Sequence, residues 1–327
     1  MNEKALTVFD QYNLKINSTY RIKGNYGCNV EKEKYILQEY NNSNEKMAAM
    51  KILYNYMEDK GFLCDCVIEN NEGNYVTISE DGYTYILKKW FNAEECNVNN
   101  EGNILGGTKK LAAFHNILRD NRELLKDVRA FHPGKNMGKV FERHNREITT
   151  IKNYIKKRKN KNFFEMSLQD IMDEYKKQAV IATENLLKST YASKFEEAVL
   201  MKTINHGCYN HHNILFDGEG IIMVNMSKIN YAPQLQDLYD WLRKVMEKNN
   251  WNIPLGNKIL EEYNKINPLN SEEYTILKIM LSYPEKFWKI INYYYNSNKA
   301  WYSEKNEEKL TQFLKQENLR HKFIENM

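Results

Sequence analysis

Apolar and polar positions alternate in short runs over the first ninety residues, which is the pattern of half-buried β-strands. The runs lie at residues 20–22, 35–40, 75–78 and 83–87. Gly24 and Gly27 interrupt the chain between the first two runs, and the turn-forming pair Asp81-Gly82 separates the last two. We therefore expect a hairpin within residues 16–40 and a second one around Asp81-Gly82.

A helical pattern lies between these hairpins. Ser43 is a suitable N-cap, Met47, Met50 and Met57 recur at helical spacing, and Gly61 suits the C-terminal end. Strands and helix together predict a small α+β lobe.

From Lys109 onward helical patterns dominate, and the change from strand to helix places a boundary near Trp90. We expect an N-terminal α+β lobe over residues 1–90 and a larger helical lobe over residues 91–327. One hairpin interrupts the helical lobe within residues 204–226.

In this hairpin, two apolar strands, 213–216 and 221–224, are joined by the turn sequence Asp217-Gly218-Glu219-Gly220. The geometry of such a hairpin brings Asn213 and Asn225 together at one end. Because Asp217-Gly218 sits where the turn requires it, we assign it to the turn rather than to a metal site.

Composition limits the functional classes. The 327 residues are 42% hydrophobic and 28% charged, which predicts a globular protein. A net charge of +4 does not indicate a nucleic-acid partner. The absence of a long apolar run predicts no membrane span, and the N-terminal residues show no secretion signal, so we expect synthesis in the cytoplasm. Five scattered cysteines favour a reducing compartment, and no metal site is expected.

The segment His206-Gly207-Cys208 carries the strongest chemical signal. Four residues separate Cys208 from Asn213, and Asn225 follows the hairpin. This pattern resembles the catalytic loop of the aminoglycoside/choline kinase-like family, in which His-Gly-Asp, four residues and Asn precede a second Asp. The resemblance implies a bilobal protein kinase-like fold. Cys208 and Asn225 occupy the two aspartate positions of that family.

Two further segments resemble the same family. Leu111–His115 matches the helix that follows the family's hinge, and Asp237 matches an acid that braces the backbone of the His-Gly turn. The resemblance implies that His206 and Asp237 are structural residues in this chain, where the catalytic carboxylates are missing.

A narrower resemblance, to the CotS group of spore coat proteins, covers nearly the whole chain. The sequence segments that carry this resemblance are Tyr85–Trp90, Glu94–Cys96, Asp237–Met246 and Pro284–Trp288. It implies synthesis in the mother cell, a location in the spore coat, and other spore coat proteins as partners.

The resemblance also shows what catalysis would lack. In kinases the loop aspartate accepts the substrate proton, and the loop asparagine and second acid hold magnesium. Cys208 offers a soft sulfur and Asn225 a neutral amide, so neither replaces a carboxylate. Gln38 follows the strand that normally carries a phosphate-binding lysine, and Glu45 and Glu58 both remain candidates for the lysine's acidic partner.

These losses predict a catalytically inactive, pseudokinase-like protein with a structural or interaction role in the spore coat. No cofactor is expected, and a small-molecule ligand in the cleft between the lobes is compatible with this role. One alternative is a small-molecule phosphotransferase that uses ATP and magnesium, with Cys208 as base and Asp217 or another carboxylate at the metal. Another is a nucleotide- or metabolite-binding sensor.

Overall fold

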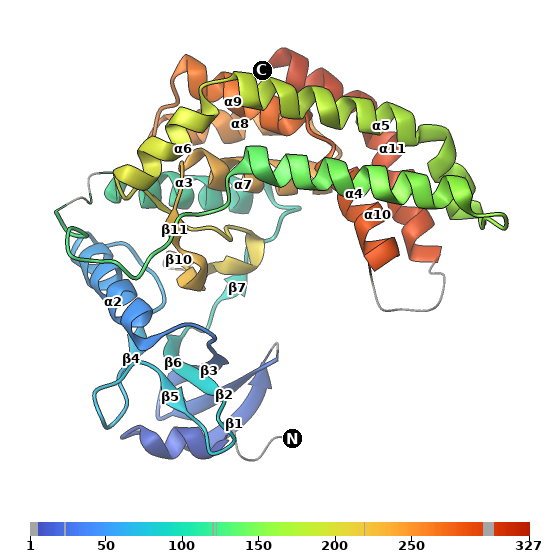
Figure 1. Cartoon of the computed structure of the whole chain (residues 1–327). Coiled ribbons are helices and arrows are strands. Elements are labelled where there is room, and N and C mark those ends of the chain that lie inside the picture. The colour runs from blue at the N-terminus through green and yellow to red at the C-terminus, as the bar shows by residue number, and fades with distance from the viewer. Residues whose placement is uncertain (1–5, 23, 120, 122, 219, 297–303) are drawn as a thin grey trace.

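The computed structural model describes residues 6–22, 24–119, 121, 123–218, 220–296 and 304–327. A small lobe built on an antiparallel sheet packs against a larger helical lobe (Figure 1). The predicted bilobal α+β architecture is therefore confirmed.

The sheet of the small lobe has the strand order β1-β2-β3-β6-β4, and β5 also pairs with β6. A short 3-10 helix, η1, spans Thr7–Gln11. The strands are β1 (Ser18–Ile22), β2 (Asn25–Val30), β3 (Glu33–Glu39), β4 (Val67–Ile68), β5 (Thr77–Ile78) and β6 (Thr84–Trp90). The hairpin expected at Asp81-Gly82 is confirmed by the pairing of β5 with β6.

The single hairpin expected within residues 16–40 is wrong, because three strands form a meander there. Gly24 lies in the first turn with a φ of +82°, but Gly27 lies inside β2, opposite Tyr20. A Cβ at Gly27 would stand 2.4 Å from the Tyr20 ring. The glycine thus makes room for a cross-strand aromatic side chain instead of ending the strand.

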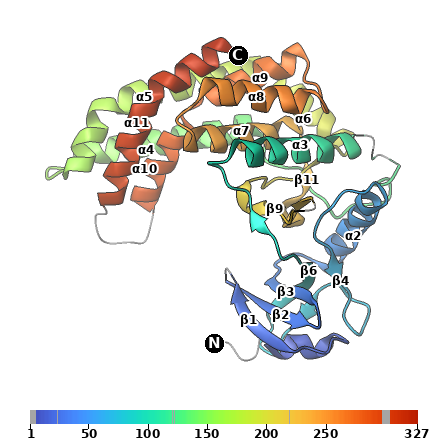
Figure 2. The same cartoon turned by 180° about the vertical axis from the view of Figure 1, so that it is seen from behind.

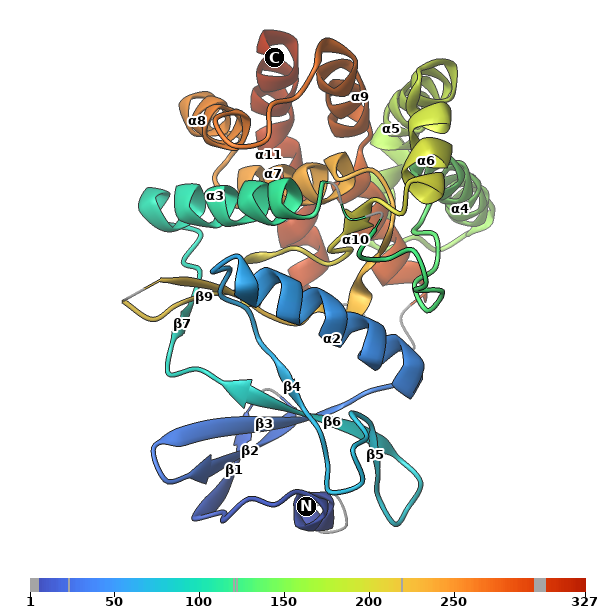
Figure 3. The same ribbon diagram turned by 90° about the vertical axis from the view of Figure 1, so that its left-hand side faces the viewer.

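Helix α2 (Asn44–Asp59) connects the two parts of this sheet. Its N-cap is Ser43, whose side chain accepts a hydrogen bond from the Lys46 amide, and Gly61 follows its C-terminus with a φ of +69°. The predicted helix and its caps are confirmed. In Figure 3, α2 lies between the sheet and the large lobe, which its buried methionines help to join.

After β6, the chain enters the large lobe through β7 (Glu94–Glu95), which pairs with β9 (Ile214–Phe216). Strand β10 (Ile221–Met223) completes a three-stranded sheet, so the predicted hairpin is confirmed. A two-stranded ribbon of β8 (Ile204–Asn205) and β11 (Asn230–Tyr231) holds the base of the loop between them. The 3-10 turns η2 (His211–Asn213) and η3 (Met226–Lys228) flank the hairpin.

Helices form the rest of the large lobe, and the first of them begins at Glu101, earlier than the pattern at Lys109 indicates. They are α3 (Glu101–Ile117), α4 (Met137–Lys157), α5 (Phe163–Lys188), α6 (Tyr191–Leu200), α7 (Leu235–Lys248), α8 (Ile253–Asn264), α9 (Ser271–Ser282), α10 (Glu285–Asn296) and α11 (Glu304–Asn326). Figure 2 shows α3 beside α7 and α8, and the three pack together.

One hydrophobic core runs from α2 through α3 into the helices of the large lobe. Within the described residues, no helix is long and apolar enough to cross a membrane.

Candidate functional site

The turn at His206-Gly207 is held by one buried carboxylate. Asp237, at the start of α7, accepts hydrogen bonds from the His206 amide at 2.5 Å and the Gly207 amide at 2.9 Å. The side chain of His115 from α3 lies 3.3 Å from the same carboxylate. This is the bracing geometry that the family resemblance implies for Asp237.

Gly207 is the residue that allows this turn. Its φ is +74°, and a Cβ built on it would stand 2.4 Å from the carbonyl oxygen of Lys228. Any side chain here would therefore strain the backbone and push against η3.

His206 is fully buried and belongs to the packing of the loop. Its Nδ1 accepts a hydrogen bond from the Cys208 amide at 3.3 Å. Burial lowers the pKa of His206 below its ordinary value, although the nearby Asp237 carboxylate acts in the opposite direction. The imidazole is thus kept neutral, as suits a structural side chain.

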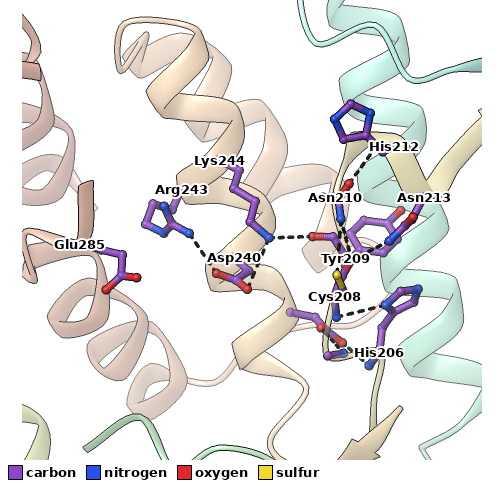
Figure 4. A network of polar contacts seen from close by, with 12 residues as sticks. His206, Cys208, Tyr209, Asn210, His212, Asn213, Asp240, Arg243, Lys244 and Glu285 are labelled. Atoms are coloured by element: carbon purple, nitrogen blue, oxygen red, sulfur yellow. Dashed lines mark hydrogen bonds and ion pairs between the residues drawn. The ribbon is translucent and has the colours of Figure 1, made fainter. Parts of the chain in front are cut away.

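The loop around Cys208 is closed by amide side chains, as Figure 4 shows. The carbonyl oxygen of Cys208 accepts hydrogen bonds from the side chains of Asn210 at 2.8 Å and Asn213 at 2.9 Å. Cys208 is partly exposed, and its sulfur accepts a weak hydrogen bond from the side-chain nitrogen of Asn210 at 3.7 Å. Among the residues that the structure describes, no carboxylate takes part in this arrangement.

Asn213 and Asn225 meet as the hairpin predicts. The Asn225 side chain donates a hydrogen bond to the Asn213 side-chain oxygen at 2.9 Å. Asn225 adopts the left-handed backbone conformation, with a φ of +62°. Asp217, at the other end of the hairpin, accepts a hydrogen bond from the Gly220 amide, which is the turn role expected for it.

A buried lysine that the sequence analysis did not select lies beside these asparagines. Lys88 Nζ donates to Asn225 Oδ1 at 2.8 Å and to Asp65 Oδ2 at 2.8 Å. The side chains of Lys88 and Asp65 are 2% and 0% exposed, so the ion pair is shielded from water. The backbone amide of Asn225 also donates a hydrogen bond to Asp65 Oδ2, at 2.9 Å.

Lys88 lies on β6, next to the strand that carries Gln38. Lys88 and Ile86 are on the same face of β6, because alternate residues share a face, and Gln38 pairs directly with Ile86. Gln38 is partly exposed and brings no positive charge. The ammonium group of this cleft thus comes from the neighbouring strand.

The acid that pairs with this lysine does not lie in α2. Glu45 and Glu58 are both exposed, whereas Asp65 follows α2 in the segment that leads to β4. The alternation of the run 83–87 could have identified Lys88. When the run is extended by one residue, Lys88 falls on an inward-facing position. No local pattern marks Asp65.

Magnesium does not fit this set of side chains. Asn225 and Asn213 offer neutral oxygens, and the Asp65 carboxylate is already paired with an ammonium group. Among the described residues, no group of three or more His, Cys, Asp or Glu side chains is placed to hold a metal ion.

A cavity of about 730 Å³ lies beside Cys208, which forms part of its lining. It lies between the start of α2, the segment before α4, and helices α4, α7 and α10, and it is also lined by η3. A pocket of this size can enclose a small organic molecule.

The family model described as "Spore coat putative kinase YutH" matches residues 5–327. No curated protein sequence matches the chain.

Solved structures share the fold at low sequence identity. An aminoglycoside phosphotransferase from Alicyclobacillus acidocaldarius is 16% identical with a TM-score of 0.85, and the match covers 98% of this chain and 94% of that one. A spectinomycin phosphotransferase in complex with ADP and spectinomycin is 13% identical with a TM-score of 0.62, over 97% and 93% of the two chains. An amicoumacin kinase is 12% identical with a TM-score of 0.61, over 98% and 96%. These matches confirm the kinase-like fold.

Proposed function

The chain belongs to the spore coat kinase family YutH, and from this premise we propose that it serves the spore coat as a kinase-fold protein that does not transfer phosphate. In this role it is synthesised in the cytoplasm of the mother cell and acts in the coat as a structural or interaction component. Its partners are other spore coat proteins.

The observation that carries this proposal is the Lys88 ammonium at 2.8 Å from the Asn225 side-chain oxygen. In a kinase of this fold, that oxygen would belong to a carboxylate that holds magnesium. Like charges repel with about 4 kcal/mol per pair of unit charges at 4 Å in a partly solvated site, and magnesium carries two. The ion would have to displace Lys88 from Asp65, which leaves the buried ammonium group without its carboxylate partner.

The position of the catalytic base supports the same conclusion. A carboxylate that accepts the substrate proton contributes about 10²–10⁴ in rate, and Cys208 provides only a soft sulfur there. The alternative carboxylate, Asp217, is engaged in the hairpin turn through the Gly220 amide. It lies at the opposite end of the hairpin from Asn225.

Thermal shift and calorimetry with ATP, each with and without magnesium, test the proposal. We expect no magnesium-dependent rise in the unfolding midpoint of the purified chain and no ATP turnover above background. A variant that combines Lys88→Met with Asn225→Asp serves as the comparison, because it places a carboxylate beside Asp65 and removes the competing ammonium. Magnesium should stabilise that variant.

Two outcomes would contradict the proposal. Magnesium-dependent turnover of ATP that disappears in Cys208→Ala would establish the phosphotransferase alternative. Magnesium-dependent stabilisation of the natural sequence by ATP without turnover would instead favour the nucleotide-binding sensor.

A further inference from the structure

The cavity beside Cys208 is lined by an excess of positive charge. Six cationic side chains surround it, against three carboxylates. The cationic residues are Lys46, Lys135, Arg143, Lys228, Lys244 and Lys289. They come from α2, the segment before α4, α4, η3, α7 and α10, so they face the same space from several sides.

The three carboxylates of the lining are already engaged. Asp237 accepts two backbone hydrogen bonds from the His-Gly turn. Asp240 lies 3.1 Å from Arg243 and 3.5 Å from Lys244, as Figure 4 shows. Burial raises the pKa of Asp240, but Lys244, Arg243 and Lys289 together outweigh burial and hold the pKa below its ordinary value.

The third carboxylate, Glu285, lies 3.3 Å from His144 and 3.6 Å from Lys289. Lys289 has a pKa below its ordinary value, first because it is desolvated and second because Arg243 is near. Glu285 is thus engaged with neighbouring side chains, like the other two carboxylates.

Three lysines of the lining lack an acidic partner. Among the described residues, no carboxylate lies within ion-pair distance of Lys46, Lys135 or Lys228. Burial lowers the pKa of Lys46, and the proximity of Lys228 lowers it further. These two ammonium groups belong to different lobes, so an anion between them would relieve a repulsion across the cleft.

Aromatic rings in the lining offer an apolar surface for the body of a ligand. His144 stacks on Trp288 with ring centroids 3.4 Å apart, and both rings line the cavity.

We propose that this cavity binds a small organic polyanion, a molecule with two or more phosphate or carboxylate groups. Lys46 and Lys228 contact one anionic group at the mouth, and Lys135 and Arg143 contact another. The inference goes beyond the proposed function, since it holds whether or not phosphate is transferred. It also implies that polycationic molecules are poor ligands, because they would meet the same six cations.

Calorimetric titration with pyrophosphate and, separately, citrate tests this inference, in each case without magnesium. Both probes carry several charges, and comparing them tells whether phosphate or carboxylate is preferred. The test variant combines Lys46→Gln with Lys228→Gln, and the control combines Lys159→Gln with Lys322→Gln, two exposed lysines outside the cavity. Both variants lose the same net charge.

We expect saturable binding of at least one probe, a loss of about tenfold or more in affinity in the test variant, and little change in the control. Binding of neither probe, or an equal loss in both variants, would overturn the inference. Magnesium-dependent ATP binding would contradict the proposed function and leave this result unaffected, so the two failures can be told apart.

Discussion

At the scale of single residues, Asp237 is the side chain on which the loop most depends. It satisfies two backbone N–H groups at a buried position, and replacement by alanine leaves both without an acceptor. We expect Asp237→Ala to lower the free energy of unfolding by roughly 1–3 kcal/mol for each stranded donor. Urea unfolding of the purified variant measures this loss.

Cys208→Ala is the matched comparison in the same loop. Its sulfur is partly exposed and has only a weak contact with Asn210, so its removal should cost less than the Asp237 substitution. Equal unfolding midpoints, or a larger loss at Cys208, would show that the loop is not braced by Asp237 and that Cys208 has another role.

The residues of the loop could be predicted from sequence because their spacing is local. His206 and Cys208 lie in the loop that precedes the hairpin. Asn213 and Asn225 flank the hairpin, so its pairing brings these two side chains together. Lys88 and Asp65 could not be predicted in this way. Lys88 lies 137 positions before Asn225 and 23 after Asp65, so only the packing of the two lobes brings the three together.

At the scale of elements, the shape of the catalytic-type loop depends on Gly207. Gly207→Ala adds a methyl group 2.4 Å from the Lys228 carbonyl oxygen and places a non-glycine residue at a φ of +74°. The backbone conformation alone costs roughly 1–2 kcal/mol, and the contact with η3 adds to it. We expect a clear fall in the urea midpoint.

Gly218→Ala provides a control with a similar backbone. Gly218 has a φ of +89° in the hairpin turn, and a Cβ there would meet nothing within 4 Å. It should therefore show only the backbone cost. If both variants lost the same stability, the close approach of Gly207 to η3 would not contribute to the loop.

The elements that the sequence analysis missed are short or shaped by distant contacts. Strands β4 and β7 have two residues each, too few for an alternating pattern to be recognised. Gly27 indicated a break in isolation, yet the ring of Tyr20 covers it across the strands and lets β2 continue. By contrast, α2 was predictable because its caps and its buried methionines are local signals.

At the scale of the whole molecule, backbone contacts join the two lobes behind the cleft. The segment after α2 pairs with the end of β10, since the Asp65 amide donates to Met223 at 3.1 Å and the Met223 amide donates to Leu63 at 3.2 Å. The Lys88 ammonium adds a side-chain link from β6 to Asn225. These contacts are buried next to the shared core.

A protein whose lobes are joined in this way should open only when most of the structure unfolds. We expect the amides of Asp65, Met223 and Asn225 to exchange their hydrogens at about the free energy of global unfolding, as amides in the core of α3 do. Hydrogen exchange followed by mass spectrometry or NMR measures these values. Amides of β1, which lies at the edge of the sheet next to β2, should exchange faster and serve as the internal reference.

The variant Lys88→Met separates the contribution of the side-chain link from that of the backbone pairing. It removes the ammonium group that pairs with the buried Asp65 carboxylate. That carboxylate should then bind water or a proton, and its hydrogen bond from the Asn225 backbone amide should break. Hydrogen exchange at the Asn225 backbone amide should then become faster, while the amides in the core of α3 should still exchange most slowly. If Asp65 and Met223 already exchange far faster than α3 in the natural sequence, the lobes separate in the folded protein and Lys88 does not keep the cleft closed.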